Sequence, residues 1–154
     1  MGEDGRALKP ELPIRILLVE DNPADAYLTR ETLLESKISY EIQHLRDGEE
    51  AIRFLEKPPE GMPDPELIIL DLNLPKIEGG DVLIAIQQNE RFREIPVMVL
   101  TSSDSPQDRR HAAQFGARVY VRKPSNLEAF MDIGEQIRAL ALSRRGAASS
   151  VRAS

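Results

Sequence analysis

Five short apolar runs, separated by stretches with helical periodicity, constrain the fold of this chain more than any other feature of its sequence. Three of the runs are almost continuously apolar, which is typical of strands that helices cover on both faces of a parallel sheet. The run at 38–45 instead alternates apolar and polar residues, as an edge strand covered on one face does. The runs are IRILLV (14–19), ISYEIQHL (38–45), LIIL (67–70), VMVL (97–100) and RVYV (118–121).

The segments between the runs carry helix signals. Asn22 and Pro23 stand where a capping residue and a first-turn proline begin a helix, and Ser105 and Pro106 repeat this arrangement. Gly116 is placed to end the helix after Pro106, because glycine readily adopts the left-handed conformation of a helix stop. The expected helices cover 22–36, 47–57, 79–89, 105–116 and 125–142. Strand and helix thus alternate as (βα)5, which predicts an α/β fold with a doubly wound, five-stranded parallel sheet.

Composition bounds the class of protein. A chain of 154 residues that is 41% hydrophobic and 30% charged suits one globular domain. We expect this domain at 12–142, with polar tails at 1–11 and 143–154. A net charge of −6 argues against nucleic-acid binding. The absence of cysteine excludes disulfides and thiolate zinc sites. No apolar run approaches the ~20 residues that span a membrane, and no secretory signal opens the chain, so we expect a cytoplasmic protein.

Polar residues follow the strands where each one ends. Glu20 and Asp21 follow the first strand, Asp71 the third, Thr101 the fourth, and Lys123 the fifth. Because the carboxyl ends of parallel strands meet at one edge, these side chains converge if the first and third strands flank the topological switch point. Clustered carboxylates repel one another, and a hard cation such as Mg²⁺ relieves that repulsion. A lysine and a hydroxyl beside them suit a phosphoryl group, with Asp71 as the nucleophile.

Four segments carry a resemblance to a known family. LLVEDNPAD, ILDLNLPK, VLTSSDS and YVRKP resemble, in order, the acidic pair, the phospho-acceptor, the switch hydroxyl and the lysine of two-component response regulator receiver domains. The resemblance covers about residues 12–142. It implies a flavodoxin-like fold with strand order 2-1-3-4-5. It also implies a phospho-acceptor that assists its own phosphorylation and dephosphorylation, and that is not otherwise an enzyme.

The same resemblance assigns roles residue by residue. Asp71 is expected to accept the phosphoryl group, while Thr101 and Lys123 contact its oxygens. Asp21 is expected to ligate Mg²⁺ directly, Glu20 to do so through water or to assist, and the backbone carbonyl of Asn73 to be a further ligand. Two further positions match the family: Tyr120, the aromatic switch that turns inward when Thr101 moves, and Pro124, the proline preceded by a cis peptide bond.

Partners are implied in the same way. A receiver takes its phosphoryl group from a histidine kinase. The loop at 56–66, DLNLPK and KPSNLEAF are similar to single-domain regulators paired with phytochrome kinases. We therefore expect a stand-alone regulator that switches a protein-interaction surface, or else a phosphorelay intermediate that passes the group onward.

A homodimer is expected through the fourth helix, fifth strand and fifth helix. Charges of both signs occur on this face: Arg109, Arg110, Arg118, Arg122, Glu128, Asp132 and Glu135. The last helix is also apolar for longer than one core stripe requires, through Leu127, Phe130, Ile133, Ile137, Leu140 and Leu142. We expect a second subunit to cover part of this excess.

Other functions fit the sequence less well. A phosphatase of the haloacid dehalogenase type needs a second aspartate two residues after its nucleophile, and here that residue is Asn73. An FMN-binding flavodoxin needs a phosphate-binding loop after the first strand, which is missing. A pseudo-receiver would not need the acidic pair, Asp71, Thr101 and Lys123. His44 and His111 have no partner at ligand spacing and are expected to be structural, and Tyr27 is expected to pack.

Overall fold

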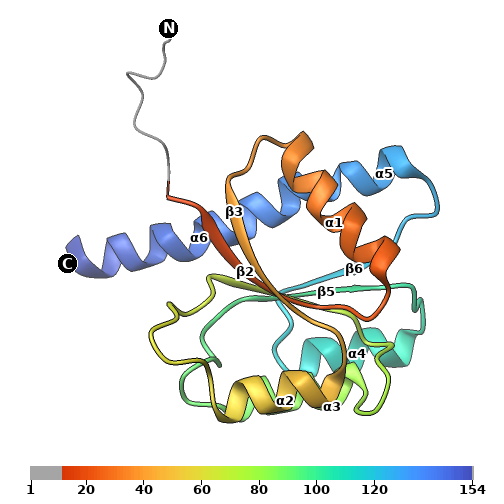
Figure 1. The fold of residues 1–154 in the computed structure, drawn as a ribbon, viewed down its shortest axis with the longest axis horizontal. Coiled ribbons are helices and arrows are strands. Elements are labelled where there is room, and N and C mark those ends of the chain that lie inside the picture. Colours follow the sequence, from red (N-terminus) through yellow and green to blue (C-terminus); the bar gives the residue numbers. More distant parts are fainter. Residues whose placement is uncertain (1–11, 154) are drawn as a thin grey trace, which may run out of the picture.

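The computed structural model describes residues 12–153 and contains an alternating series of strands and helices (Figure 1). The strands are β2 (Ile14–Val19), β3 (Tyr40–Leu45), β4 (Leu67–Leu70), β5 (Val97–Thr101) and β6 (Val119–Arg122). The helices are α1 (Pro23–Glu35), α2 (Gly48–Glu56), α3 (Gly79–Gln88), α4 (Pro106–Gln114), α5 (Leu127–Met131) and α6 (Ile133–Ala153).

The sheet is parallel throughout, with the order β3-β2-β4-β5-β6. Since β2 is the first strand of the chain, this order is the predicted 2-1-3-4-5. The chain moves to one side of β2 for β3 and then crosses to the other side for β4. The carboxyl ends of β2 and β4 therefore flank the topological switch point, where open α/β sheets bind their ligands.

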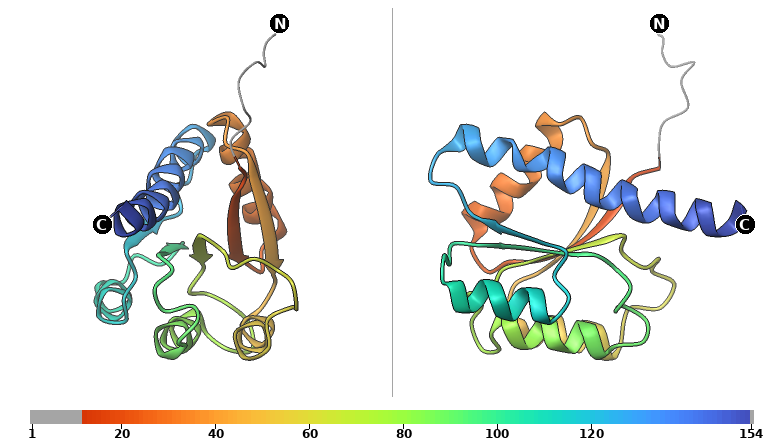
Figure 2. Two further views of the ribbon diagram at one scale, coloured as in Figure 1. Left: turned by 90° about the vertical axis from the view of Figure 1, so that its left-hand side faces the viewer. Right: turned by 180° about the vertical axis from the view of Figure 1, so that it is seen from behind.

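Helices cover both faces of the sheet and create two apolar cores (Figures 1 and 2). Helices α2, α3 and α4 cover one face, and α1, α5 and α6 cover the other. Successive residues of a strand point to opposite faces, so Leu17 and Ile68 belong to the first core while Leu18 and Ile69 belong to the second. Each of these four side chains is almost fully buried. Burial on both faces explains why these strands read as continuous apolar runs.

Most predicted helix ends are confirmed. The Asn22 side chain accepts hydrogen bonds from the backbone N–H groups of Ala24 (2.9 Å) and Asp25 (3.2 Å). The Ser105 side chain caps α4 by accepting from the Asp108 N–H at 3.3 Å. Gly116 ends that helix with a φ of +88°, a left-handed conformation that glycine adopts without steric cost.

The last predicted helix is interrupted. It breaks after Met131 into α5 and α6, where helix α1 crosses very closely. The Thr32 hydroxyl donates to the Met131 carbonyl and accepts from the Gly134 N–H, so it takes part in the hydrogen bonding of the broken turn. A Cβ at Gly134 would lie 2.3 Å from the Ser36 hydroxyl and 2.5 Å from the Thr32 carbonyl oxygen. The interruption therefore follows from a contact with a helix about a hundred residues earlier in the chain.

Three further predictions about the backbone need correction. The second strand begins at Tyr40, because the Ile38 N–H donates to Leu33 O in the turn after α1. The segment 143–153, predicted as a tail, continues the backbone of α6. The bond before Pro124 is trans, as is every peptide bond among the described residues; trans is the lower-energy form even before proline. The predicted tail at 1–11 lies outside the described residues.

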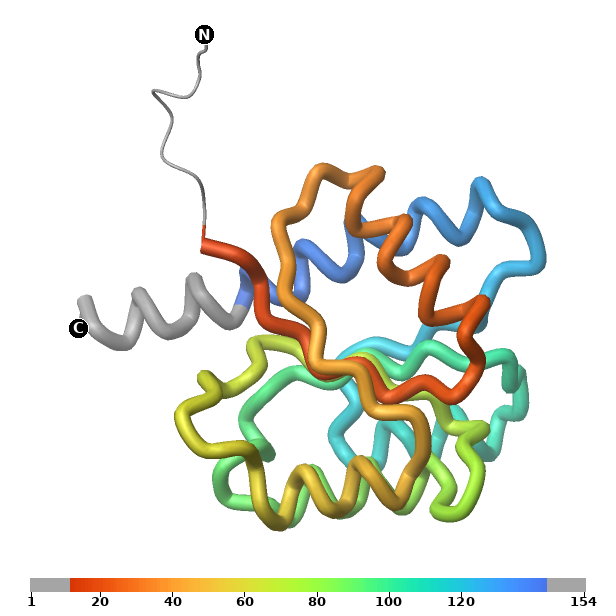
Figure 3. The backbone as a smooth tube through the Cα atoms, in the orientation of Figure 1, coloured from red at the N-terminus to blue at the C-terminus, as the bar shows by residue number. Residues whose placement is uncertain are grey.

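The described residues contain no helix that is both long and apolar enough to cross a membrane. Figure 3 shows the long loop of residues 57–66, in yellow, at the end of the sheet away from the switch point.

The contact at Gly134 generates a stability prediction. Gly134→Ala should lower the free energy of unfolding by about 1–3 kcal/mol, because the added methyl group overpacks the contact with α1. Chemical denaturation of the parent and the variant measures this. Gln136→Ala, at an exposed position of the same helix, is the control and should change the value by less than about 0.5 kcal/mol. Equal stability of Gly134→Ala and the parent would contradict this prediction, because it would show that α1 can move away from Gly134 at no cost in free energy.

Candidate functional site

Three acidic residues meet at the switch point. Glu20 and Asp21 follow β2, Asp71 follows β4, and one carboxylate oxygen from each lies within 4.8 Å of the others. Glu20 and Asp71 are buried, whereas Asp21 is exposed. The sheet thus brings together the acids that the sequence predicted would converge, with Asp21 on the solvent side.

Asp71 is held at both of its carboxylate oxygens. Its Oδ1 accepts a hydrogen bond from the backbone N–H of Asn73 at 3.0 Å, and its Oδ2 accepts from Lys123 Nζ at 2.9 Å. Its own N–H donates to the Val19 carbonyl at 3.1 Å, which extends the β2–β4 ladder by one residue. These contacts fix the orientation of a carboxylate that is only 4% exposed.

Lys123 is surrounded by carboxylates. Its Nζ lies 2.9 Å from Glu20 Oε1, 2.8 Å from Asp25 Oδ2 and 2.9 Å from Asp71 Oδ2. An ammonium has three N–H donors, so each can serve one carboxylate. The backbone N–H of Lys123 donates to Thr101 O at 2.7 Å, which anchors the residue just after β6. Although burial lowers the pKa of Lys123, its hydrogen bonds to Asp25, Glu20 and Asp71 outweigh this and hold the pKa well above its ordinary value.

The pKa of Glu20 is raised as well, but for a carboxyl group a higher pKa favours the neutral form. Burial raises the pKa of the Glu20 carboxyl to about 7, even though its hydrogen bond with Lys123 favours the charged form. The nearby charge of Asp71 adds to the increase. One lysine therefore does not fully offset the negative charge of the buried acids, so an additional positive charge would be favoured at this site.

Thr101 links this acidic centre to the loop before α4. It is fully buried, and its Oγ1 accepts from Asn73 Nδ2 at 3.4 Å and from the Ser103 N–H at 3.4 Å. Both contacts are at the long end of hydrogen-bond distances. Tyr120 on β6 donates its hydroxyl to the Ser103 carbonyl at 3.1 Å. The predicted switch pair, Thr101 and Tyr120, is thus connected through one residue of the β5–α4 loop.

The residues at this site fit a hard divalent cation. The clustered donors are all carboxylate oxygens, which Mg²⁺ and Mn²⁺ prefer, and two of the three acids are buried with incomplete compensation of their charge. Asn73 lies beside Asp71 through its backbone N–H. The assignment of its carbonyl as a ligand stays a prediction.

Asp25 is a member of the site that the sequence reasoning missed. It lies in the first turn of α1, and its carboxylate makes the shortest of the three contacts with Lys123. The available signal was an acidic residue four positions after Asp21, near the start of a helix that begins at the same sheet edge. By itself this signal also fits an ordinary acidic residue at a helix N-terminus.

The sequence predicts structural roles for three other side chains, those of His44, His111 and Tyr27. His44 Nε2 is hydrogen-bonded to the Glu20 carbonyl at 2.7 Å, and the His111 ring packs against Phe115 with centroids 4.7 Å apart. Neither histidine belongs to the acidic group at the switch point. Tyr27, expected to pack, is instead 60% exposed on α1, because the buried stripe of that helix passes through Ala26 and Thr29.

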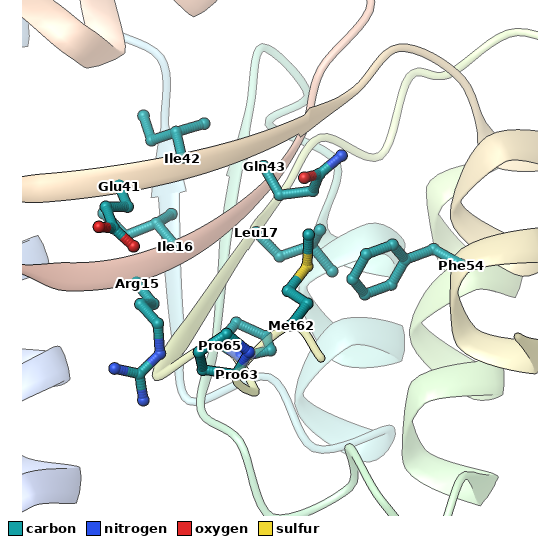
Figure 4. A pocket seen from close by; sticks show the side chains of 10 residues that line it. All are labelled: Arg15, Ile16, Leu17, Glu41, Ile42, Gln43, Phe54, Met62, Pro63 and Pro65. Atoms are coloured by element: carbon teal, nitrogen blue, oxygen red, sulfur yellow. The ribbon is translucent and has the colours of Figure 1, made fainter. Parts of the chain in front are cut away.

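A separate apolar pocket lies away from the acidic centre (Figure 4). It has a volume of about 200 Å³ and opens between β2, β3, the end of α2 and the loop at 57–66. Figure 4 shows Leu17, Gln43, Phe54 and Met62 converging on it. Its lining residues are Arg15, Ile16, Leu17, Glu41, Ile42, Gln43, Phe54, Met62, Pro63 and Pro65. None of these residues belongs to the acidic site.

Asp71 is grouped with an acidic pair and bonded to Lys123, and the buried Thr101 is linked to it through Asn73. This arrangement, at the switch point of a five-stranded parallel sheet, is typical of two-component receivers. The chain belongs to the response regulator receiver domain family, whose sequence profile matches residues 16–134.

The chain is also similar to individual response regulators, both in sequence and in structure. Response regulator Rcp1 from Synechocystis sp. is 44% identical over 118 residues, covering 75% of this chain and 80% of Rcp1. The crystal structure of the phosphorylated cyanobacterial phytochrome response regulator RcpA has a TM-score of 0.78 at 37% identity, covering 86% of this chain and 96% of RcpA. The Mn²⁺-bound form of Rcp1 has a TM-score of 0.75 at 41% identity, covering 82% of this chain and 93% of that structure.

The raised pKa of Glu20 predicts how metal binding depends on pH. Cation binding favours an ionised carboxylate, so below about pH 7 it must displace a proton from Glu20. The affinity for Mg²⁺ should therefore rise by up to about tenfold per pH unit between about pH 5.5 and pH 7, and then level off. Calorimetric titration in buffers of different ionisation enthalpy measures both the affinity and the proton release.

Glu20→Gln is the control for this experiment, because it keeps the shape of the side chain and removes the titrating group. It should bind Mg²⁺ more weakly and with a flatter pH dependence. An affinity of the parent protein that stays constant across this range, without proton release, would contradict the assignment.

Proposed function

We propose that this protein is a response regulator that accepts a phosphoryl group from the phosphohistidine of a histidine kinase on Asp71, in a Mg²⁺-dependent reaction. The observation that carries the proposal is the buried Asp71 carboxylate, held at 2.9 Å from Lys123 Nζ and grouped with Glu20 and Asp21. A carboxylate placed in this way can act as a nucleophile while neighbouring positive charge stabilises the oxygens of the phosphoryl group.

The chemical step is an in-line displacement at phosphorus. One carboxylate oxygen of Asp71 forms the new O–P bond, and the P–N bond to the histidine of the kinase breaks, so the electron pair leaves with the imidazole. The Asn73 N–H on Oδ1 and the Lys123 ammonium on Oδ2 orient the nucleophile before the reaction. Lys123 then neutralises charge on the transferred group, which remains bound as an aspartyl phosphate.

Asp21, Asp71 and the carbonyl of Asn73 would hold Mg²⁺, with Glu20 assisting directly or through water. When bound, the cation would neutralise negative charge on the phosphoryl oxygens. This assignment is supported by the oxygen donors clustered within 4.8 Å and by the relative Rcp1, whose structure was solved in an Mn²⁺-bound form.

The switch runs from Asp71 to the surface formed by α4, β6 and the α5–α6 region. Among the described residues, the hydrogen bonds to Thr101 Oγ1 are both 3.4 Å long, so a phosphoryl oxygen can compete for the hydroxyl. A shift of Thr101 would disturb Ser103, whose N–H contacts Thr101 and whose carbonyl accepts from Tyr120. The Arg109 guanidinium lies 4.5 Å from the centre of the Tyr120 ring. Reorientation of Tyr120 would therefore also move a charge on α4 and shift the population between two packed states.

This surface is the proposed dimer interface, although the prediction of an apolar excess along the last helix is wrong. Phe130, Ile133, Ile137 and Leu140 are buried within the chain itself, so they are not an apolar excess awaiting a partner. Only Leu127 (62% exposed) and Leu142 (37% exposed) remain of that set. The support that remains is exposed charge on this face. Asp104 already pairs within the chain with Arg109 at 3.5 Å and Arg122 at 3.3 Å, but the other charged side chains there are also exposed: Arg110, Arg118, Glu128, Asp132 and Glu135. Exposed charges of both signs can pair across a two-fold axis.

The kinase partner is proposed to be of the phytochrome type, and the protein is proposed to act in the cytoplasm as a stand-alone regulator. The support is the similarity to RcpA, which is described as a phytochrome response regulator, and to Rcp1. Matches to Rcp1 cover 80% of its length, so the likeness extends over most of that relative.

The central test concerns Asp71. Incubation with acetyl phosphate and Mg²⁺ should add one phosphoryl group, and Asp71→Asn should abolish the labelling, because an amide is not a nucleophile towards phosphorus under these conditions. Intact-protein mass spectrometry detects the added mass. Asp81→Asn, at an exposed acid in α3, is the matched control and should label like the parent. Labelling retained in Asp71→Asn, or absent from the parent, would refute the proposal.

The assembly is tested by sedimentation. We expect a homodimer at micromolar concentration through the face containing α4, β6 and α5. Arg110→Glu, an exposed substitution on α4, should weaken this dimer by about tenfold if its charge faces acids of the second subunit. Arg93→Glu, also exposed but located between α3 and β5, is the control. A monomer both with and without phosphorylation would exclude the dimer, and an equal effect of the two variants would place the interface elsewhere.

A further inference from the structure

Lys123 has one carboxylate partner that the reaction at Asp71 does not use. Glu20 and Asp71 belong to the group of acids whose oxygens lie close enough to share a cation, whereas Asp25 is outside that group. Asp25 nevertheless contacts Lys123 Nζ at 2.8 Å, from a position 98 residues away in the sequence. It is therefore the one acid of the three around Nζ that neither reacts nor belongs to the metal cluster.

Hydrogen bonds at the start of α1 hold the backbone of Asp25 in position. Its backbone N–H donates to the capping side chain of Asn22 at 3.2 Å, and its carbonyl accepts from the Thr29 hydroxyl at 2.9 Å. Thr29 is almost completely buried, so this hydrogen bond ties the first turn of α1 to the protein interior. With the backbone held, the Asp25 carboxylate extends from α1 to Lys123, which follows β6.

The carboxylate contacts of the Lys123 ammonium would change during the proposed reaction. In the structure, this ammonium is shared among Glu20, Asp25 and Asp71. Once Glu20 and Asp71 direct their oxygens to a cation, those two contacts would weaken before phosphoryl oxygens reach Lys123. The Lys123 side chain is only 9% exposed, and a buried ammonium without a carboxylate partner is strongly destabilised.

We propose that Asp25 is a positioning residue, which tethers the Lys123 ammonium at the acceptor site while Asp71 reacts. The inference rests on the proposed phosphorylation of Asp71 for its functional meaning, although the tether itself does not depend on it. Through this contact, the first turn of α1 determines where the positive charge stands when the phosphoryl group arrives.

The tether is tested by the chemical accessibility of Lys123. Acylation of this lysine by sulfosuccinimidyl acetate, followed by peptide mass spectrometry, should be slow in the parent protein with and without Mg²⁺. In Asp25→Ala it should be faster, and adding Mg²⁺ should widen the difference to about tenfold, because the contact removed is then the main one left. Asp25→Glu, which can still reach Lys123 with a carboxylate, should restore most of the protection.

Two further variants separate tethering from a general effect on α1. Asp25→Asn keeps the shape of the side chain and loses its charge, so it should acylate at a rate between those of the parent and Asp25→Ala. Glu35→Gln removes a charge from the exposed last turn of the same helix and should acylate Lys123 like the parent. Parent-like acylation of Asp25→Ala with Mg²⁺ present, or equal acceleration by Glu35→Gln, would overturn the proposal.

The functional consequence is measured separately. With acetyl phosphate and saturating Mg²⁺, Asp25→Ala should reach the same final stoichiometry as the parent, with a rate constant lower by about three- to tenfold. An unchanged rate would show that the tether has no role in the reaction. If the parent itself accepts no phosphoryl group, the proposed function fails, while the acylation experiment still decides whether Asp25 holds Lys123.

Discussion

The ion cluster around Lys123 is the interaction on which the site depends. One ammonium lies within 2.9 Å of three carboxylates that come from the end of β2, the start of α1 and the end of β4. Without it, the buried Glu20 and Asp71 would repel each other, and burial already raises the pKa of Glu20 to about 7 with the lysine in place. Lys123 therefore offsets enough of the negative charge for Glu20 and Asp71 to be buried. It leaves enough of that charge for a further cation to bind favourably.

The fold makes this ion cluster possible by bringing together strand ends that are distant in the sequence. The chain crosses from one side of β2 to the other between β3 and β4, which opens the crevice where the acids meet. Apolar cores on both faces of the sheet leave the strands little freedom to shift in register. Charges at the strand ends are consequently held in a nearly fixed arrangement, and the orientation of Asp71 is set in advance of the proposed reaction.

The same rigidity gives a local change a path to the surface. Thr101 is buried between the acidic centre and the β5–α4 loop, and its hydroxyl is held by two long contacts. Ser103 connects it to Tyr120, and Tyr120 stacks against Arg109 on α4. Each of these residues touches the next, so a small movement at Thr101 has a continuous set of packed groups through which to act. The proposed tether at Asp25 would keep Lys123 in place while this happens.

The sequence by itself determined the (βα)5 fold, the order of its strands through the family resemblance, and the residues Glu20, Asp21, Asp71, Thr101 and Lys123 that the sheet brings to one edge. These features follow from local periodicity and from the rule that parallel strands end together. Only the tertiary structure decided that Asp25 joins the site, that α1 interrupts the last helix at Gly134, that Tyr27 is exposed, and that three apolar side chains of α6 pack inside the chain: Ile133, Ile137 and Leu140. These are contacts between elements far apart in the sequence, and they depend on the spacing and rotation of packed helices, which residue patterns within a single element do not specify.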